Sequence, residues 1–262
     1  MTVESVSLED KLIFNTAKIE VSDNGNFIYA ENGDIFSKKY NITINAQKFK
    51  YNKKLSTLEA NGDIELKDLN EGIVLKAQKI FFNIGNEEIE VVGDIKIRDL
   101  NRDISIKTQE ILYNIANKTI ESNTNSIIED NSNNLFFAEN FIFTLNNDLI
   151  KLGVTKLIDA KKNVIFIEKS YINLNSKKLI GKDLVINFDN TSFKKNNDPR
   201  LSGSTISMDK DETLVKKGVF TTCKKNDDCP PWQLMAKEIK HDKNKKIINY
   251  KNAWLKLYDK PV

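Results

Sequence analysis

Few residues of this chain have the types and spacing that catalysis requires. Its single histidine, His241, lies in the segment EIKHDKN, just before an expected turn. Cys223 and Cys229 are separated by five residues and lack the second pair of ligands that a zinc site needs. The acidic pair Glu87–Glu88 falls in an expected turn, where we interpret it as solvated rather than catalytic. We therefore expect no enzyme activity, no metal site and no cofactor.

Glycine–aspartate pairs recur in the first hundred residues and invite a calcium interpretation. They occur as Gly33–Asp34, Gly62–Asp63 and Gly93–Asp94, about thirty residues apart. Calcium-binding β-rolls repeat such pairs every nine residues, so this spacing is too sparse. We instead expect each glycine to allow a bend or bulge within a β-strand.

Composition and charge set limits on the class of protein. The 262 residues are 40% hydrophobic and 29% charged, as in a globular protein, with one large or two smaller domains. The 40 basic and 37 acidic residues look interspersed, and their net charge of +3 argues against nucleic acid as a partner. No apolar run is long enough for a membrane helix. The first residues lack the layout of a signal peptide, so the protein is cytosolic or its leader has been removed.

Short segments of alternating polarity predict an all-β fold. Examples are ITINA, DIELKD, LVINFD and WLKLYD, bounded by turns rich in Asn, Asp and Lys. Alternation over four to seven residues is typical of half-buried strands. We find no segment with apolar residues at helical spacing.

A repeat of about thirty residues indicates how the strands are arranged. The segment AQKFKYNKKLSTLEANGDIELKD (46–68) returns as AQKIFFNIGNEEIEVVGDIKIRD (77–99). The first apolar residues of successive copies, separated by 30, 31, 31, 30 and 31 positions, are Ile19, Phe49, Ile80, Ile111, Phe141 and Ile172. Units of nearly constant length stack on one another, so their inward side chains form columns.

Stacked, bent hairpins enclose an apolar interior that is either a packed core or an open trough for an acyl chain. The sequence does not distinguish the two, because both require the same residues. As candidate lining of a lipid-binding trough we expect Ile19, Val21, Phe49, Tyr51, Ile80, Phe82, Ile111, Tyr113, Phe141 and Phe143.

The C-terminal segment carries a more specific pattern. It contains Thr221–Thr222–Cys223, Pro231–Trp232, the stretch from Ala236 to Ile239 and the closing Lys260–Pro261–Val262, preceded by DPRLSGSTI. These elements resemble the OstA/LptD family of outer-membrane lipopolysaccharide-assembly proteins, where the periplasmic domain meets the membrane barrel. The thirty-residue repeats are similar to the OstA-like units of that family.

The resemblance implies a twisted β-jellyroll of OstA-like strand-turn-strand repeats over residues 1–220. It implies that residues 221–262 lead towards a barrel that this chain does not contain, so we expect a truncated domain or gene fragment without its leader. The implied function is to carry lipopolysaccharide in the trough to the outer-membrane barrel for insertion in the outer leaflet, at the periplasmic face of that membrane. The alternatives are a soluble periplasmic bridge protein of the same superfamily and a structural β-solenoid that binds no lipid.

The resemblance also implies partners. In the family, a periplasmic bridge protein adds its strand to the jellyroll, and an outer-membrane lipoprotein plugs the barrel. Here the first strand, with Leu12, Phe14, Ile19 and Val21, has no proline to protect it, so it is the candidate docking edge unless upstream residues cover it.

The family also pairs the cysteine of the Thr–Thr–Cys motif with a cysteine of the barrel. In this chain Cys223 either forms a small loop disulfide with Cys229, or both remain free thiols.

Overall fold

The computed structural model describes residues 4–8, 12–189, 191, 193, 197–224, 231–258 and 260–262. Its strands pair with antiparallel neighbours along the chain, and short 3-10 turns are the helical elements among the described residues. The fold is an all-β twisted jellyroll of stacked strand-turn-strand repeats, as the sequence predicts. No helix in the described part of the chain is long and apolar enough to cross a membrane.

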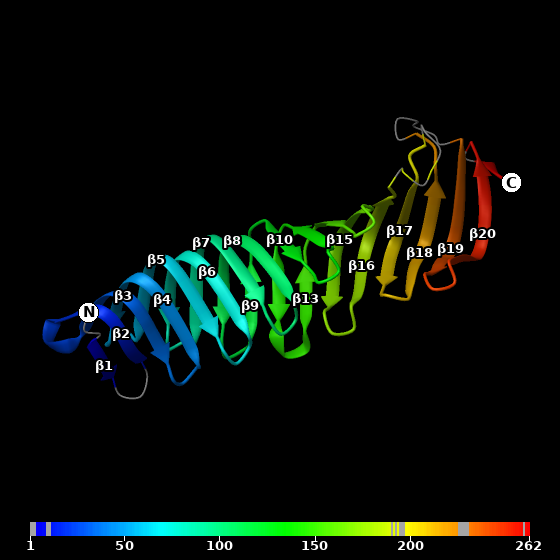
Figure 1. The fold of residues 1–262 in the computed structure, drawn as a ribbon. Helices are drawn as coiled ribbons and strands as arrows, with labels where there is room; N and C mark the ends of the chain where they lie inside the picture. The colour runs from blue at the N-terminus through cyan, green and yellow to red at the C-terminus, as the bar shows by residue number, and fades with distance from the viewer. Residues whose placement is uncertain are drawn as a thin grey trace. The chain divides into compact units, whose positions relative to one another are not determined.

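The chain forms two compact units. Unit 1 comprises residues 1–130 and 142–146, and unit 2 comprises residues 131–141 and 147–262. The main strands of unit 1 are β1 (Glu4–Leu8), β2 (Leu12–Ser22), β3 (Phe27–Ser37), β4 (Ile42–Asn52), β5 (Thr57–Asp68), β6 (Ile73–Asn83), β7 (Glu88–Asp99), β8 (Ile104–Asn114), β9 (Thr119–Ser122) and β10 (Ser126–Glu129). Figure 1 shows β3 to β8 following one another as successive hairpins.

The long strands of unit 1 bury one side of an alternating pattern. In β4 the buried side chains are Ile42, Ile44, Ala46, Phe49 and Tyr51. The equivalent positions of β6 and β8 are also buried, 31 and 62 residues further on. Two consecutive exposed residues interrupt the alternation in mid-strand. Equivalent side chains therefore stack in columns across the hairpins, as the repeat predicts.

Two of the recurring glycines lie at β-bulges. The register of β5 against β4 and β6 shifts around Gly62, and that of β7 shifts around Gly93. Both glycines have positive φ, +81° and +88°, which a side chain would strain. The predicted bulge is confirmed at these two positions. Gly33 differs, because its φ is not positive and a Cβ there would lie 2.2 Å from the carbonyl oxygen of Asn15.

The hairpin turns of unit 1 form two series, one at each end of the strands. We call 38–41, 69–72 and 100–103 the first-edge turns, and 53–56, 84–87 and 115–118 the second-edge turns. Asp68 begins a first-edge turn, and its Oδ1 accepts the backbone N–H groups of Asn70 and Glu71 at 2.9 and 3.0 Å. Asn83 begins a second-edge turn in the same way, accepting the N–H of Asn86 at 3.1 Å. Short polar side chains thus define both series of turns.

Unit 2 is also built from antiparallel strands, and its inward side chains become less buried along the chain. Its strands are β11 (Leu135–Ala138), β13 (Leu149–Leu152), β14 (Thr155–Ile158), β15 (Val164–Asn173), β16 (Lys178–Asn187), β17 (Arg200–Met208), β18 (Glu212–Thr221), β19 (Trp232–Asp242), β20 (Ile247–Leu257) and β21 (Lys260–Pro261), whereas β12 (Phe141–Thr144) falls across the division. The inward position is buried at Ile165, Ile186 and Leu201, half-buried at Leu234 and exposed at Leu255. The interior of unit 2 therefore becomes more accessible towards β20.

The boundary that the sequence suggests between residues 220 and 221 lies at the end of β18. Beyond it, β19 pairs with β18 from Leu234 to Asp242, so the antiparallel ladder continues across that point. The separate role of residues 221–262 remains a prediction.

Candidate functional site

The candidate site is the apolar interior of unit 1 together with the polar contacts that close it. Most of the predicted lining residues of unit 1 are buried: Phe49, Tyr51, Ile80, Phe82, Ile111, Tyr113 and Phe143. Phe141, which belongs to unit 2, is also buried. Phe82 and Tyr113 are each only 1% exposed, which means that protein atoms surround them. Ile19 is half-buried, and Val21 is 56% exposed. Ile19 and Val21, in the first copy of the repeat, are therefore not part of the buried column that the later copies form.

Turns from opposite ends of the strands meet along one side of unit 1. The hydroxyl of Tyr40, in a first-edge turn, donates a hydrogen bond to the carbonyl oxygen of Ile84 at 3.2 Å. Lys39 forms an ion pair with Glu87 at 2.5 Å, and the Tyr40 and Phe82 rings lie edge to face at 5.7 Å. The hydrogen bond to Lys39 lowers the pKa of the Glu87 carboxyl. Pairs of residues 44 and 48 positions apart thus connect the two series of turns.

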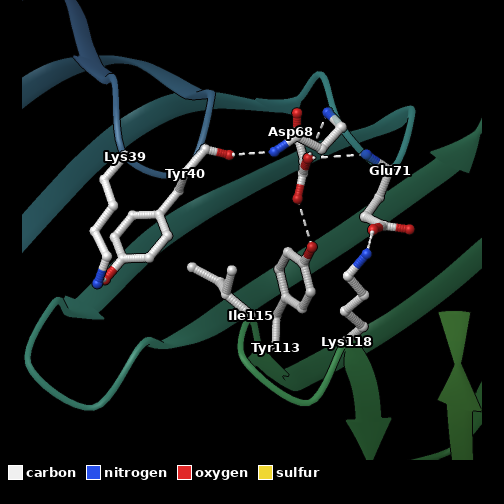
Figure 2. A pocket seen from close by; sticks show the side chains of 8 residues that line it. Lys39, Tyr40, Asp68, Glu71, Tyr113, Ile115 and Lys118 are labelled. Carbon is white, nitrogen blue, oxygen red and sulfur yellow. Dashed lines mark hydrogen bonds and ion pairs between the residues drawn. The ribbon is translucent and has the colours of Figure 1, made fainter. Parts of the chain in front are cut away.

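A second contact of the same kind lies one repeat further along. The Tyr113 hydroxyl donates to Asp68 Oδ2 at 2.5 Å, and Lys118 forms an ion pair with Glu71 at 2.8 Å (Figure 2). Burial and the neighbouring Asp68 carboxylate raise the pKa of Tyr113 well above its usual value. The phenol is consequently neutral at physiological pH and acts as a donor.

The third contact is centred on Arg102. Its guanidinium bonds Asp99 Oδ2 at 2.8 Å and donates to the carbonyl oxygen of Leu145 at 2.7 Å. Its central carbon lies 5.4 Å from the centre of the Phe143 ring, within cation–π distance. Asp99 is only 1% exposed, so this carboxylate needs the charge beside it.

Together these three contacts form a seam, defined by Lys39–Tyr40–Glu87, Asp68–Tyr113–Glu71–Lys118 and Asp99–Arg102–Leu145. Each joins a first-edge turn or its preceding strand to residues about a repeat and a half later in the chain. A cavity of about 180 Å³ opens at the first two contacts, lined by Lys39, Tyr40, Asp68, Asn70, Glu71, Tyr113, Ile115 and Lys118 (Figure 2). The seam encloses the apolar interior with polar groups that are paired to one another.

The seam was not predicted from the sequence. A signal was present, because Asp68 and Asp99 occupy the inward phase of their strands, in line with the apolar positions before them. An acidic residue in an inward column implies a polar partner across the interior. The identity of that partner depends on contacts between distant turns.

Two of the recurring aspartates have structural partners. The amide of Gln47 donates to Asp63 at 2.5 Å, as that of Gln109 does to Asp94 at 3.3 Å, so these aspartates are engaged across neighbouring strands. Within the described residues, no group of histidine, cysteine, aspartate and glutamate could hold a metal ion. His241 lies near the end of β19, where burial and the positive Lys161 and Lys243 lower its pKa.

The two cysteines differ in what the structure describes. Cys223 is half-buried, and its thiol contacts the carbonyl oxygen of Trp232 at 3.8 Å. Arg200 donates to the Cys223 carbonyl oxygen at 2.5 Å, which fixes the backbone there. Cys229 lies outside the described residues, so both oxidation states of the pair stay open.

The predicted docking edge is partly covered by the chain itself. Strand β1 pairs with Leu12 to Thr16 of β2, and the side chains of Leu12 and Phe14 are buried. Ile19 and Val21 belong to the second half of β2, beyond that pairing. The part of this edge that remains for docking is therefore limited to the second half.

The chain is similar to solved structures, but not to known sequence families. No family model matches the chain, and no curated protein sequence matches it. A solved structure, "LptH, the LptA homologous periplasmic component of the conserved lipopolysaccharide transport device from Pseudomonas aeruginosa", is similar with a TM-score of 0.40 and 13% identity. The alignment covers 44% of this chain and 84% of that one. A similarity at this level does not by itself establish a family.

Proposed function

We propose that this chain is the periplasmic domain of a lipopolysaccharide-assembly protein and guides lipopolysaccharide towards an outer-membrane barrel. The observation that carries the proposal is the column of inward apolar side chains at a constant spacing of 31 residues, represented by Phe49, Ile80 and Ile111. The Cys–Pro–Trp segment and its resemblance to the OstA/LptD family add to this. A bridge protein, a barrel and its lipoprotein plug are the partners that the proposal includes.

The proposed mechanism involves no covalent chemistry. Acyl chains gain about 0.8 kcal/mol for each methylene removed from water, so a single deep site would hold the lipid too firmly to release it. Stacked repeats instead offer successive sites of similar affinity, between which a lipid can move. The seam of unit 1 would have to part for an acyl chain to enter from the side, since the interior is otherwise enclosed.

A structural β-solenoid is the second candidate, and the near-complete burial of Phe82 and Tyr113 favours it. A packed core needs no ligand to be stable, whereas a trough needs room for one. A soluble bridge protein of the same superfamily differs from the main proposal in its partners and not in its interior.

Photo-crosslinking with purified lipopolysaccharide tests the proposal. A photoreactive phenylalanine analogue at Phe82, or at Tyr40 beside the cavity, should capture the lipid. The same analogue at the outward-facing Lys50 is the matched control. Circular dichroism first establishes that each variant is folded. Capture at Lys50 but at neither inner position would contradict the proposal and support the structural solenoid.

A further inference from the structure

The two units carry opposite net charges. Unit 1 has 16 basic and 22 acidic residues, whereas unit 2 has 24 basic and 15 acidic residues. The net charge of +3 therefore combines −6 in unit 1 with +9 in unit 2, so the interspersed charges are divided unequally between the units. A net charge of +9 favours the binding of an anionic partner to unit 2.

The outward face of β15 and β16 exposes large apolar side chains in two cross-strand pairs. Phe166 lies opposite Val185, with 46% and 39% of their side chains exposed. Tyr171 lies opposite Ile180, with 45% and 49% exposed. The Phe166 row continues through Ser202, Val219 and Met235 to Trp254, which is 43% exposed. Apolar groups in register on a solvent-facing side exceed the isolated exposed residues that every protein has.

Lysines lie between and beside these apolar rows. Lys169 and Lys182 are directly opposite each other, and Lys216 lies two strands further along the same row. Within the described part of the chain, the ammonium groups of these three lysines form no ion pair or hydrogen bond. Like charges directly opposite one another destabilise a sheet, so Lys169 and Lys182 repel each other.

The same face also carries acidic groups, but fewer of them. Glu168 and Asp183 are exposed beside the lysine pair. Glu238 lies opposite Lys216 and forms an ion pair with Lys251 at 3.7 Å. Further lysines on the outer side of the last strands, Lys217 and Lys237, leave the face with an excess of positive charge. Only some of the lysines on this face therefore have an acidic partner close by.

From these observations we propose that the outer face of β15–β20 binds the surface of an anionic lipid bilayer. Exposed aromatic side chains next to lysines suit the boundary between lipid headgroups and acyl chains. The rings enter the headgroup layer while the ammonium groups stay with the phosphates. This surface belongs to unit 2 and lies on the side of β15 and β16 opposite their buried side chains, so the inference does not depend on the proposed transport function.

Vesicle binding by the full chain tests the inference. The probe is a vesicle of phosphatidylglycerol and phosphatidylethanolamine without lipopolysaccharide, compared with one of phosphatidylcholine alone. The chain should co-sediment with the anionic vesicles only, and Trp254 should shift to shorter emission wavelength on binding. The shift should be lost in Trp254→Phe, which separates this residue from Trp232. High salt should weaken binding.

Two matched triple variants make the result specific to this face. Lys169→Gln/Lys182→Gln/Lys216→Gln should reduce the affinity on the order of 100-fold, since each lysine near an anionic membrane contributes about fivefold. Lys79→Gln/Lys96→Gln/Lys107→Gln, on the outer side of unit 1, removes the same charge and should bind almost normally. Circular dichroism checks that both variants are folded.

Three results would overturn the inference. Equal binding to phosphatidylcholine vesicles would remove the role of charge, and equal losses in the two triple variants would indicate only a general charge effect. Binding to heparin without binding to anionic vesicles would assign the surface to a soluble polyanion. None of these results depends on lipopolysaccharide capture at Phe82, so the two proposals can fail separately.

Discussion

Replacing Tyr113 by phenylalanine tests the seam with the smallest change of shape. The hydroxyl donates to Asp68 Oδ2 at 2.5 Å, and both side chains are almost completely buried. Phenylalanine keeps the ring and its packing, so no cavity forms beyond the volume of one oxygen atom. The substitution therefore isolates the hydrogen bond.

The expected loss of stability depends on the hydrogen bonds that Asp68 keeps in the variant. A hydrogen bond to a charged group contributes about 1.5–3 kcal/mol, and a buried acceptor without a partner adds its own desolvation cost. The backbone N–H groups of Asn70 and Glu71 still bond the other carboxylate oxygen, which limits that cost. We expect Tyr113→Phe to lower the free energy of unfolding of unit 1 by about 2 kcal/mol.

Urea unfolding combined with hydrogen exchange measures this loss within unit 1. Protection should fall in peptides from β5 and β8, which the hydrogen bond connects. Tyr29→Phe, an exposed tyrosine of the same unit, should change stability by less than about 0.5 kcal/mol. In a double-mutant cycle with Asp68→Asn, the two losses should not add. If Tyr113→Phe is as stable as Tyr29→Phe, the seam contact does not hold the unit together and the reasoning is refuted.

Three further predictions concern pH, backbone strain and the first seam contact. Since burial raises the pKa of Tyr113 above its unfolded value of 10.0, unfolding releases a proton at high pH. Stability should therefore fall as pH rises above 10, by up to about 1.4 kcal/mol per unit, and Tyr113→Phe should lose that slope in urea titrations. Gly62→Ala should cost about 1–3 kcal/mol in the same assay, because φ is +81° and a Cβ would lie 2.5 Å from Gln47 Oε1. Lys39→Ala should accelerate hydrogen exchange around Glu87 at low salt, with Lys38→Ala as the neutral control and no difference expected in 1 M salt.

The sequence predicted the fold because the determining signals are local. Alternating polarity in segments such as ITINA depends only on neighbouring residues, and the spacing of 31 between Phe49 and Ile80 requires only that the units stack. The bulge at Gly62 was also predictable, since a mid-strand glycine followed by aspartate tolerates a left-handed backbone.

The candidate site was predictable only in part, because some of its contacts join residues far apart in the sequence. Phe82 and Tyr113 were expected to face inward, and they do. Val21 follows the same sequence pattern but lies in the first copy of the repeat, where it remains 56% exposed. The pairing of Asp68 with Tyr113 spans 45 residues, and it depends on how far the hairpins curl, which no local pattern specifies.

The seam and the proposed transport function make opposing demands on unit 1, and their energies can be compared. Burying ten methylenes of an acyl chain gains about 8 kcal/mol. Breaking the Tyr113–Asp68 and Arg102–Leu145 hydrogen bonds costs about 3–6 kcal/mol in total. The free energy gained on burying the lipid thus exceeds the cost of breaking these two hydrogen bonds by only a few kcal/mol, which allows the lipid to leave again. Tyr113→Phe lowers the opening cost, so it should increase lipopolysaccharide capture by a photoreactive residue at Phe82 without changing capture at Lys50. Unchanged or reduced capture at Phe82 in that variant, with the fold intact, would mean that lipid does not enter through the seam.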